Sequence, residues 1–312
     1  MRRVVIARTK SATNLELADG SAGSRWELMR PEDALRELRP GDVAVGRLDV
    51  LPTLDGVENG LWALGALDAR GVQVLNGPSA VLACHDKLLT ARLLDRAGLP
   101  HPPTRHVRAT DTGQLPPVYS DVVVKPRFGS MGEGVTRCRD DVALHRLLEA
   151  RAGTSWFDRH GALVQDLVPP LGYDLRVLVA GTRVIGGVRR VSRAGEWRTN
   201  VALGAHRVAT SIPDDAQILA LRAAREFGVS LVGVDLLPTE DGGWVILELN
   251  GAVEFTRTYN VSHDVFELAR AELIRHADRR PTVAEPLDTE ASITPGRARR
   301  QLVDLSIDGR PE

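Results

Sequence analysis

The sequence is poor in several residue types, and each scarcity excludes a class of protein. It has two cysteines, Cys84 and Cys138, and neither belongs to a C-x-x-C pair. We therefore expect buried thiols in a reducing compartment, with no disulfide and no zinc site. No apolar run approaches the roughly 18 residues of a membrane-spanning helix, and the N-terminal MRRVVIARTK lacks the apolar stretch of a signal peptide. The expected location is cytoplasmic, with no membrane partner.

The chain also has almost no net charge. A formal charge of −1 and a pI near 6.7 give the whole surface no attraction for nucleic acid, so no nucleic acid partner is expected. With 43% hydrophobic residues, 312 residues suffice for two or three modest cores, at roughly 100 to 200 residues per domain. We expect a globular protein with several lobes.

Lysine is scarce in a chain that is rich in arginine. Of 40 Lys and Arg residues, three are lysine: Lys10, Lys87 and Lys125. A compact ammonium contacts a phosphate oxygen differently from a broad planar guanidinium, so a lysine should persist where that contact matters. Lys125 directly precedes a glycine loop, although three residues are also compatible with chance placement.

That glycine loop is the most informative stretch of the chain. Residues 122–135 read VVVKPRFGSMGEGV, an apolar strand followed by a loop with Gly129, Gly132 and Gly134. Glycine lets backbone N–H groups approach a polyphosphate closely, and successive N–H groups form a concavity that binds anions. The spacing fits neither the Walker A motif nor the dinucleotide motif G-x-G-x-x-G. Taken alone, such a loop is more often a plain tight connection between strands.

The first 85 residues predict a small parallel α/β lobe. Strands at 2–7, 42–45 and 72–75 alternate with helices at 31–38 and 60–70. Arg47, Thr53 and Asp55 lie in a polar loop after a strand, where α/β lobes usually contact ligands. A solvated connection explains this loop equally well.

Residues 86–166 predict an α+β unit in which the glycine loop is a flap over a sheet. Its elements are a helix at 86–97, a strand at 122–124, a helix at 141–150 and a strand at 162–168. Lys87 lies in the first turn of its helix, where the helix dipole disfavours a positive charge. That position hints at an external anion.

Residues 167–278 predict an antiparallel sheet with two helices. Strands at 173–179 and 182–191 form a hairpin, and the next strand carries Arg198 and Asn200. Because side chains alternate along a strand, Asp174 and Arg176 share one face. Solvated antiparallel faces carry such polar residues routinely. Helices are expected at 213–227 and 265–277, and residues 279–312 read as a charged, extended or flexible tail.

A second hairpin carries acidic residues. Residues 231–237 and 244–249 are apolar strands joined by a Pro/Asp/Gly/Gly turn. Asp235 interrupts the first strand, and Glu248 and Asn250 share one face of the second. Buried carboxylates cost several kcal/mol unless they are paired or bind a metal. Three oxygen donors with room for phosphate and water favour Mg²⁺; neutralisation of each acid by an arginine is the alternative.

These motifs together resemble the ATP-grasp superfamily and, within it, the RimK-like carboxylate–amine ligases. The resemblance runs from about residue 47 to residue 277 and rests on seven ordered motifs: NGPSAVLACHDKLLTARLLDRAGLPHPPT, VVVKPRFGSMGEGV, LVQDLV, YDLRVLV, RRVSRAGEWRTN, GVDLL and ILELNG. It implies an α/β (α+β) ATP-grasp fold. The expected parts are a small N-terminal parallel α/β lobe (1–85), a central lid subdomain (86–166), a C-terminal antiparallel-sheet subdomain (167–278) and the tail (279–312).

The resemblance also implies roles for individual residues around ATP. Lys87 and Lys125 would bind the nucleotide phosphates, and Asp174 would lie near the ribose. The loop over the phosphates would comprise Gly129, Ser130, Met131, Gly132 and Gly134. The hinge beside adenine would comprise Gln165, Asp166, Leu167 and Val168.

For the chemistry, the resemblance implies a metal site and an arginine wall. Asp235, Glu248 and Asn250 would hold two Mg²⁺ ions, which Mn²⁺ could replace. Arg190, with Arg176 and Arg198 nearby, would face an acyl phosphate, and Asn200 would help to order that wall.

The implied activity is ligation of a carboxylate to an amine with release of ADP. The carboxylate would belong to a small molecule, a peptide or a carrier protein, the amine to an amino acid, and the enzyme to a homo-oligomer, a dimer or a tetramer. A small-molecule kinase on the same fold and a nucleotide-responsive binding protein without turnover are the alternatives. The runs VALGA after Asn200 and GAVEFTRTYN after Asn250 depart from the family pattern, so the acceptor stays open.

Overall fold

The computed structural model describes residues 1–20, 23–115 and 117–279. Of the predicted tail at 279–312, only Arg279 belongs to the described residues, and the rest lies outside them. Within the described ranges, no helix is long and apolar enough to cross a membrane. Both cysteines are buried and free.

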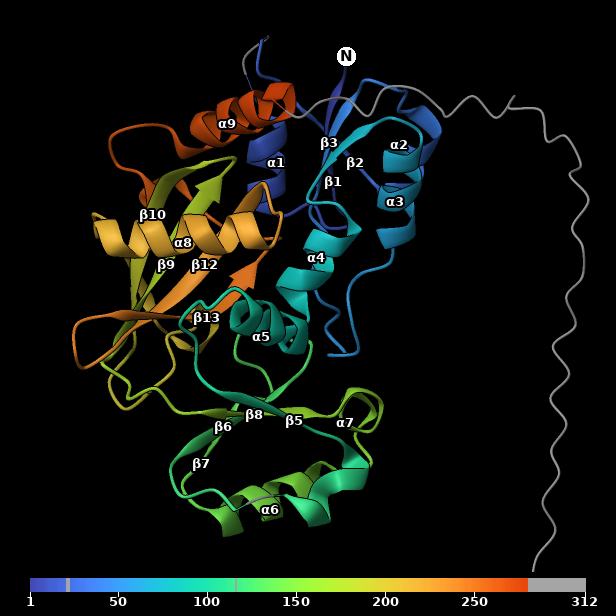
Figure 1. The fold of residues 1–312 in the computed structure, drawn as a ribbon. Coiled ribbons are helices and arrows are strands. Elements are labelled where there is room, and N and C mark those ends of the chain that lie inside the picture. Colours follow the sequence, from blue (N-terminus) through green and yellow to red (C-terminus); the bar gives the residue numbers. More distant parts are fainter. Residues whose placement is uncertain (21–22, 116, 280–312) are drawn as a thin grey trace, which may run out of the picture. The chain divides into compact units, whose positions relative to one another are not determined.

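The N-terminal lobe is the parallel α/β unit that the sequence predicts (Figure 1). Its sheet has the strand order β2-β1-β3-β4, and every pair is parallel. The elements are β1 (Arg3–Ile6), α1 (Ala12–Ala18), β2 (Glu27–Met29), α2 (Pro31–Glu37), β3 (Val43–Gly46), α3 (Leu61–Ala69), β4 (Gln73–Leu75) and α4 (Pro78–His85). Of these, α1, β2 and α4 are short elements that the sequence pattern does not predict.

The lid subdomain is an antiparallel sheet with the strand order β5-β8-β6-β7. Its elements are β5 (Thr104–Val107), η1 (Ala109–Gln114), β6 (Val122–Pro126), β7 (Thr136–Cys138), α6 (Asp141–Arg151), α7 (Ser155–His160) and β8 (Ala162–Asp166). Leu148 of α6 and Phe157 of α7 pack in one cluster with Val124 and Val164 of the sheet. The glycine loop connects β6 to β7 and therefore projects from this sheet.

The C-terminal subdomain is a five-stranded antiparallel sheet with the order β11-β10-β9-β12-β13. Its elements are β9 (Tyr173–Ala180), β10 (Arg183–Val191), η2 (Val201–Leu203), β11 (His206–Ala209), α8 (Asp214–Glu226), β12 (Leu231–Pro238), β13 (Trp244–Asn250), η3 (Arg257–Tyr259) and α9 (Val265–Arg279). The prediction that Arg198 and Asn200 lie on a strand is wrong. Residues 192–205 form a loop that contains the short helix η2. Gly195 and Gly204 allow its turns, with φ of 79° and 97°.

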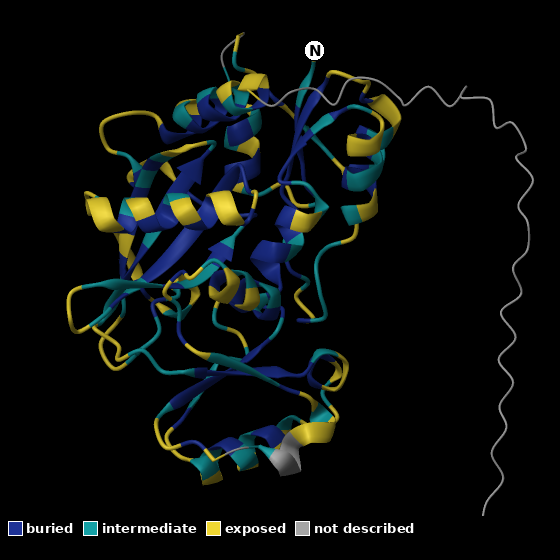
Figure 2. Ribbon diagram, viewed as in Figure 1, coloured by how far each residue is buried: buried dark blue, intermediate teal, exposed yellow. Residues whose placement is uncertain are grey.

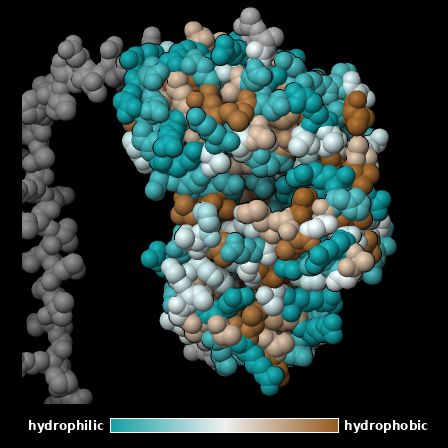
Figure 3. Space-filling model, turned by 180° about the vertical axis from the view of Figure 1, so that it is seen from behind, coloured by the Kyte–Doolittle hydropathy of each residue, from teal (hydrophilic) through white to brown (hydrophobic). Residues whose placement is uncertain are grey.

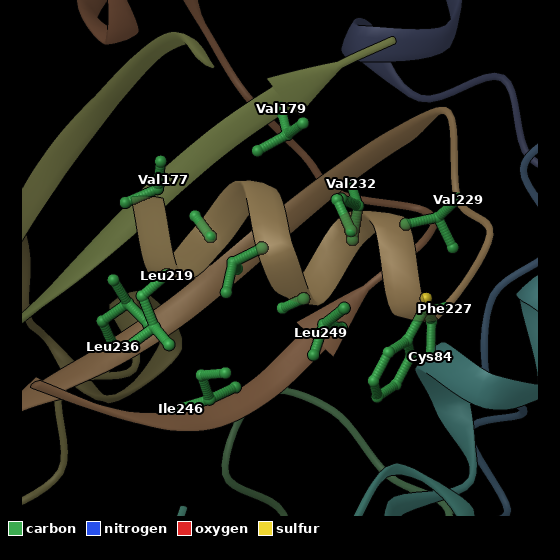
Figure 4. Close-up of a cluster of buried hydrophobic side chains, with 14 of the residues drawn as sticks. Cys84, Val177, Val179, Leu219, Phe227, Val229, Val232, Leu236, Ile246 and Leu249 are labelled. Atoms are coloured by element: carbon green, nitrogen blue, oxygen red, sulfur yellow. The ribbon is translucent and has the colours of Figure 1, made fainter. Parts of the chain in front are cut away.

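The two faces of this sheet have different neighbours, because side chains alternate along each strand. Val177 and Val179 of β9 face α8 in a cluster with Leu236, Ile246 and other buried residues (Figure 4). On the opposite face, Leu178 packs in a cluster that includes α9 and strands of the N-terminal lobe. The central strands β9 and β12 are mostly buried, whereas the edge strand β11 and the outer face of α8 are exposed (Figure 2).

Helix α5 (Lys87–Arg96) lies in the range predicted for the lid but packs elsewhere. Its Leu94 and the following Leu99 belong to the cluster between α8 and the C-terminal sheet. The backbone N–H of Ile246 also donates to the carbonyl of Pro100, at 2.8 Å. Residues 86–103 therefore support the C-terminal sheet, and the lid sheet begins at β5.

Residues 50–57, here called the bridging loop, extend from the N-terminal lobe and pack against the lid. Val50 pairs with Val57 at the base of the loop, and Leu54 at its tip has a φ of 60°. The Leu54 side chain is buried in the hydrophobic cluster of the lid. His160 Nε2 of α7 donates to the carbonyl of Asp55, at 2.9 Å. The N-terminal lobe thus supplies part of the core of the lid.

Candidate active site

A cleft of about 980 Å³, partly open to solvent, lies between the lid and the C-terminal subdomain. Seen from behind, the surface is hollowed where the lid meets the rest of the described chain, and hydrophobic side chains border the hollow (Figure 3). The cleft brings together α5, the glycine loop, the end of β8, the loop after β10 and the hairpin of β12 and β13. Its wall contains all predicted site residues except Gly134, Asp174, Arg176 and Asn250.

Two lysines converge on the floor of the glycine loop. Lys87 Nζ donates to the carbonyl of Gly129 and lies 3.5 Å from Glu248 Oε2. Lys125 is 5% exposed and donates to Gln165 Oε1, at 2.7 Å. Burial, together with the nearby charge of Lys87, lowers the pKa of Lys125 to about 8. Two partly desolvated ammonium groups this close together favour an anion between them and the loop.

Lys87 is held in place by its neighbour Asp86. The Asp86 side chain caps α5 by accepting from Leu88 N, at 3.1 Å. The same carboxylate accepts from Arg127 Nε, at 2.7 Å. The N–H of Lys87 donates to the carbonyl of Arg127, at 3.0 Å. Helix α5 and the start of the glycine loop are therefore fixed to each other.

The glycine loop contacts the loop that follows β10. Met131, Gly132 and Gly134 have φ of 55°, 78° and 71°, a conformation that favours glycine. A Cβ at Gly132 would lie 2.8 Å from Asn200 Oδ1. Arg198 Nη1 donates to the carbonyl of Val135, at 3.3 Å. Glycine is thus needed where the lid approaches the C-terminal subdomain.

The hinge end of the cleft has an apolar wall that the sequence motifs do not predict. Gln165 is oriented by Lys125 and by Thr104 Oγ1, to which its Nε2 donates at 2.8 Å. The missed apolar lining includes Val123, Trp197, Leu237 and Leu247. Leu247 and Glu248 both face the cleft because the register shifts between Asp235 and Leu236, which places a bulge at Leu247. Simple alternation along β13 could not reveal that bulge.

The acidic hairpin forms as predicted, and Asp235 pairs directly with Glu248 in register. Asp235 is fully buried and accepts from Arg176 Nε at 2.6 Å and from Arg190 Nη2 at 2.7 Å. Burial alone would raise the pKa of Asp235, but the charges and hydrogen bonds of Arg176 and Arg190 outweigh it and lower the pKa to about 2. In this state the arginines neutralise Asp235, which is the alternative that the sequence left open.

The same donors are suited to magnesium. Asp235 and Glu248 are carboxylates, and the Asn250 side chain makes no hydrogen bond to other described residues. Mg²⁺ prefers a few such oxygen donors with water and substrate phosphates. No group of three or more His, Cys, Asp or Glu residues arranged to hold a metal occurs within the described ranges. A magnesium ion here would therefore take the Asn250 amide or phosphate oxygens as further ligands, and Arg190 would have to release Asp235.

Two predicted roles disagree with the geometry. Asp174 is 0% exposed, and both of its oxygens accept from Arg190, so it cannot contact a ribose in the cleft. Arg176 is absent from the wall of the cleft and donates twice to Asp235. It therefore lies beside Asp235, the predicted metal ligand, and outside the wall of the cleft.

Arg198 does line the cleft and is held by a carboxylate of its own loop. Its Nε and Nη2 donate to Glu196, at 3.0 and 2.9 Å. This hydrogen bonding, with the charge of Arg198, lowers the pKa of Glu196 to about 2. The pair stays ionised at neutral pH and keeps the guanidinium against the lid.

Comparisons with known proteins identify a family for most of the chain. Residues 84–268 match the RimK-like ATP-grasp domain. The chain is 31% identical over 193 residues to the alpha-aminoadipate–LysW ligase LysX of Sulfurisphaera tokodaii, covering 61% of this chain and 67% of that protein. It is 28% identical over 244 residues to the tetrahydromethanopterin:alpha-L-glutamate ligase of Methanosarcina acetivorans, covering 68% and 75%.

The fold agrees as well. A crystal structure of a RimK domain ATP-grasp protein from Sphaerobacter thermophilus superposes with a TM-score of 0.63 at 20% identity, covering 87% of this chain and 98% of that one. The predicted ATP-grasp fold is confirmed. The named relatives are ligases, which agrees with the predicted ATP-dependent ligase and does not favour the kinase. The chain thus belongs to the RimK-like ATP-grasp family.

Proposed function

We propose that this protein joins a carboxylate to an amine at the expense of ATP. The γ-phosphate of ATP passes to a carboxylate oxygen and gives an acyl phosphate with ADP. The amine then attacks the acyl carbon, the amide bond forms and phosphate leaves. The observation that carries the proposal is the cleft itself, in which Lys87 and Lys125 lie under a glycine loop and face the Asp235–Glu248 pair.

The residues of the cleft would divide the work as follows. Lys87, Lys125 and the N–H groups of the glycine loop would bind the phosphates. Val123, Trp197 and Leu247 would cover the base. These residues hold the nucleotide and exclude water, which protects an acyl phosphate from hydrolysis.

Asp235, Glu248 and Asn250 would hold Mg²⁺, and Mn²⁺ is proposed as a replacement. When bound, such an ion supplies Lewis-acid stabilisation of the charge on the phosphates. Arg190 and Arg198 both line the cleft. They would offset charge on the transferring group.

The acceptor is proposed as a class. One relative is named as a ligase of alpha-aminoadipate and LysW, and another as a ligase of tetrahydromethanopterin and alpha-L-glutamate. By analogy, this chain would add an amino acid to a carboxylate of a small molecule, a peptide or a carrier protein. A cytoplasmic homo-oligomer stays part of the proposal.

An ADP-release assay that pairs amino acids with candidate carboxylates tests the proposal. ADP should appear only when both partners are present, and hydroxylamine in place of the amine should give a hydroxamate. Glu248→Ala should abolish turnover while circular dichroism and thermal unfolding stay close to those of the wild type. ADP release without any need for an amine, or a stable phosphorylated product, would instead support the kinase.

A further inference from the structure

The buried acid Asp174 is not part of the wall of the cleft in which the proposed reaction takes place. Asp174 and Arg190 are direct register partners on β9 and β10. Arg190 Nε donates to Asp174 Oδ1 at 2.8 Å, and Arg190 Nη2 donates to Oδ2. Such a two-pronged pair fixes both the position and the plane of a guanidinium. Arg190 reaches the wall of the cleft, whereas Asp174 does not.

A third side chain completes this arrangement. Thr199 Oγ1 donates to Asp174 Oδ2, at 2.6 Å, and Thr199 is itself buried. Thr199 lies between Arg198 and Asn200, and both of these residues lie against the lid. The segment of the C-terminal subdomain that contacts the glycine loop therefore also hydrogen-bonds Asp174, the partner of Arg190.

We propose that Asp174 and Thr199 are positioning residues that fix the guanidinium of Arg190 toward the transferring phosphoryl group. The inference rests on the proposed function. Arg190 Nη2 lies 2.7 Å from Asp235 Oδ2 and shares that carboxylate with Arg176. If Asp235 binds a metal, Arg190 loses its hydrogen bond to Asp235. Asp174 is then the carboxylate that still binds the guanidinium of Arg190. Without Asp174, a buried and mobile guanidinium would remain beside the metal ligands.

The inference predicts an effect on the transition state more than on nucleotide binding. The test compares the affinity for ADP with the affinity for ADP plus aluminium fluoride, a mimic of a phosphoryl group in transfer, by calorimetry in Mg²⁺. The wild type should bind ADP with aluminium fluoride at least about 100-fold more tightly than it binds ADP alone. Asp174→Asn, which keeps the shape and removes the charge, should reduce that ratio by about tenfold or more. The affinity for ADP alone should change less than about threefold.

A double-variant cycle shows whether Asp174 acts through Arg190. Arg190→Ala should reduce the ratio as Asp174→Asn does, and the double variant should be no worse than Arg190→Ala, because residues that act as one unit are not additive. Thr199→Val should reduce the ratio by about threefold to tenfold, and Thr199→Ser should restore it, since only serine keeps the hydroxyl. If Asp174→Asn fails to fold, the comparison of Thr199→Val with Thr199→Ser still tests the inference.

The outcomes separate the two ideas. Additive losses in the double variant, equal weakening of ADP and the mimic, or no difference between Thr199→Val and Thr199→Ser would overturn the positioning role. Wild-type protein that does not bind ADP would overturn the proposed function and this inference with it.

Discussion

Replacing Lys125 with methionine should make the nucleotide-free protein more stable while it destroys nucleotide binding. Lys125 is buried, and a second lysine lies close to it. Among the described residues, its ammonium makes one hydrogen bond, to Gln165. Methionine has a similar length and no charge, so it removes the desolvation cost without leaving a large cavity. The residue that function needs is thus one that folding disfavours.

The pKa gives the size of the effect. Burial, together with the charge of Lys87, lowers the pKa of Lys125 from 10.5 to about 8. At about 1.4 kcal/mol for each pH unit, the buried charge costs roughly 3 kcal/mol of unfolding free energy at pH 7. Losing the hydrogen bond to Gln165 destabilises the variant by about 1 to 2 kcal/mol, which offsets part of this gain. The methionine variant should therefore be about 1 to 2 kcal/mol more stable than the wild type at pH 7.

The pH dependence has a definite sign. Because the folded-state pKa is the lower one, the unfolded chain binds more protons between pH 8 and pH 10.5, and wild-type stability gains over this window. The cost is fully present below about pH 8 and disappears as the pH approaches 10.5. The advantage of methionine should therefore shrink by about 2 to 3 kcal/mol between pH 7 and pH 10 and change sign.

Urea denaturation at pH 7 and pH 10 measures both effects. Lys10→Met is the matched control, because Lys10 is exposed and the same substitution there should change stability by less than about 0.5 kcal/mol. Destabilisation by Lys125→Met at pH 7, or an effect that is equal at both pH values, would refute the reasoning.

Three further substitutions test other parts of the structure. Leu54→Ala should lower the unfolding free energy by about 2 to 4 kcal/mol and weaken ATP binding, measured by urea denaturation and calorimetry, because Leu54 fills the lid core against Gly129. Asn76→Ala should cost about 2 to 4 kcal/mol in the same denaturation with little change in ATP affinity, since Asn76 has a φ of 51° and its buried side chain bonds Ser230 and Leu231. Asp86→Ala should raise the KM for ATP more than Asp86→Asn, because asparagine can still cap α5; equal effects would contradict this.

The sequence predicts the parts of the site that depend on local pattern. Alternation places Asp174 and Arg176 on one face of β9, and the turn chemistry of the second hairpin brings Asp235 opposite Glu248. Glycines and a preceding lysine mark the phosphate end, where the chemistry is carried by a few adjacent residues.

The parts that depend on distant partners could not be predicted. Asp174 reads as a possible ligand contact because nothing local shows that Arg190 takes both of its oxygens. The loop at 192–205 has strand-like residues but is shaped by Gly195 and Gly204 and by contacts with the lid. The bulge at Leu247 depends on pairing with β12.

The bridging loop has a consequence for any attempt to divide this protein. A fragment that starts at residue 86 would contain the whole sequence match to the family apart from residues 84 and 85, yet it would lack Leu54. Its lid would carry an apolar hole beside the glycine loop, open to water. Exchanging N-terminal lobes between relatives would therefore also exchange a side chain of the lid core. A chimaera should form a well-packed lid only when Leu54 and the lid residues around it come from the same parent.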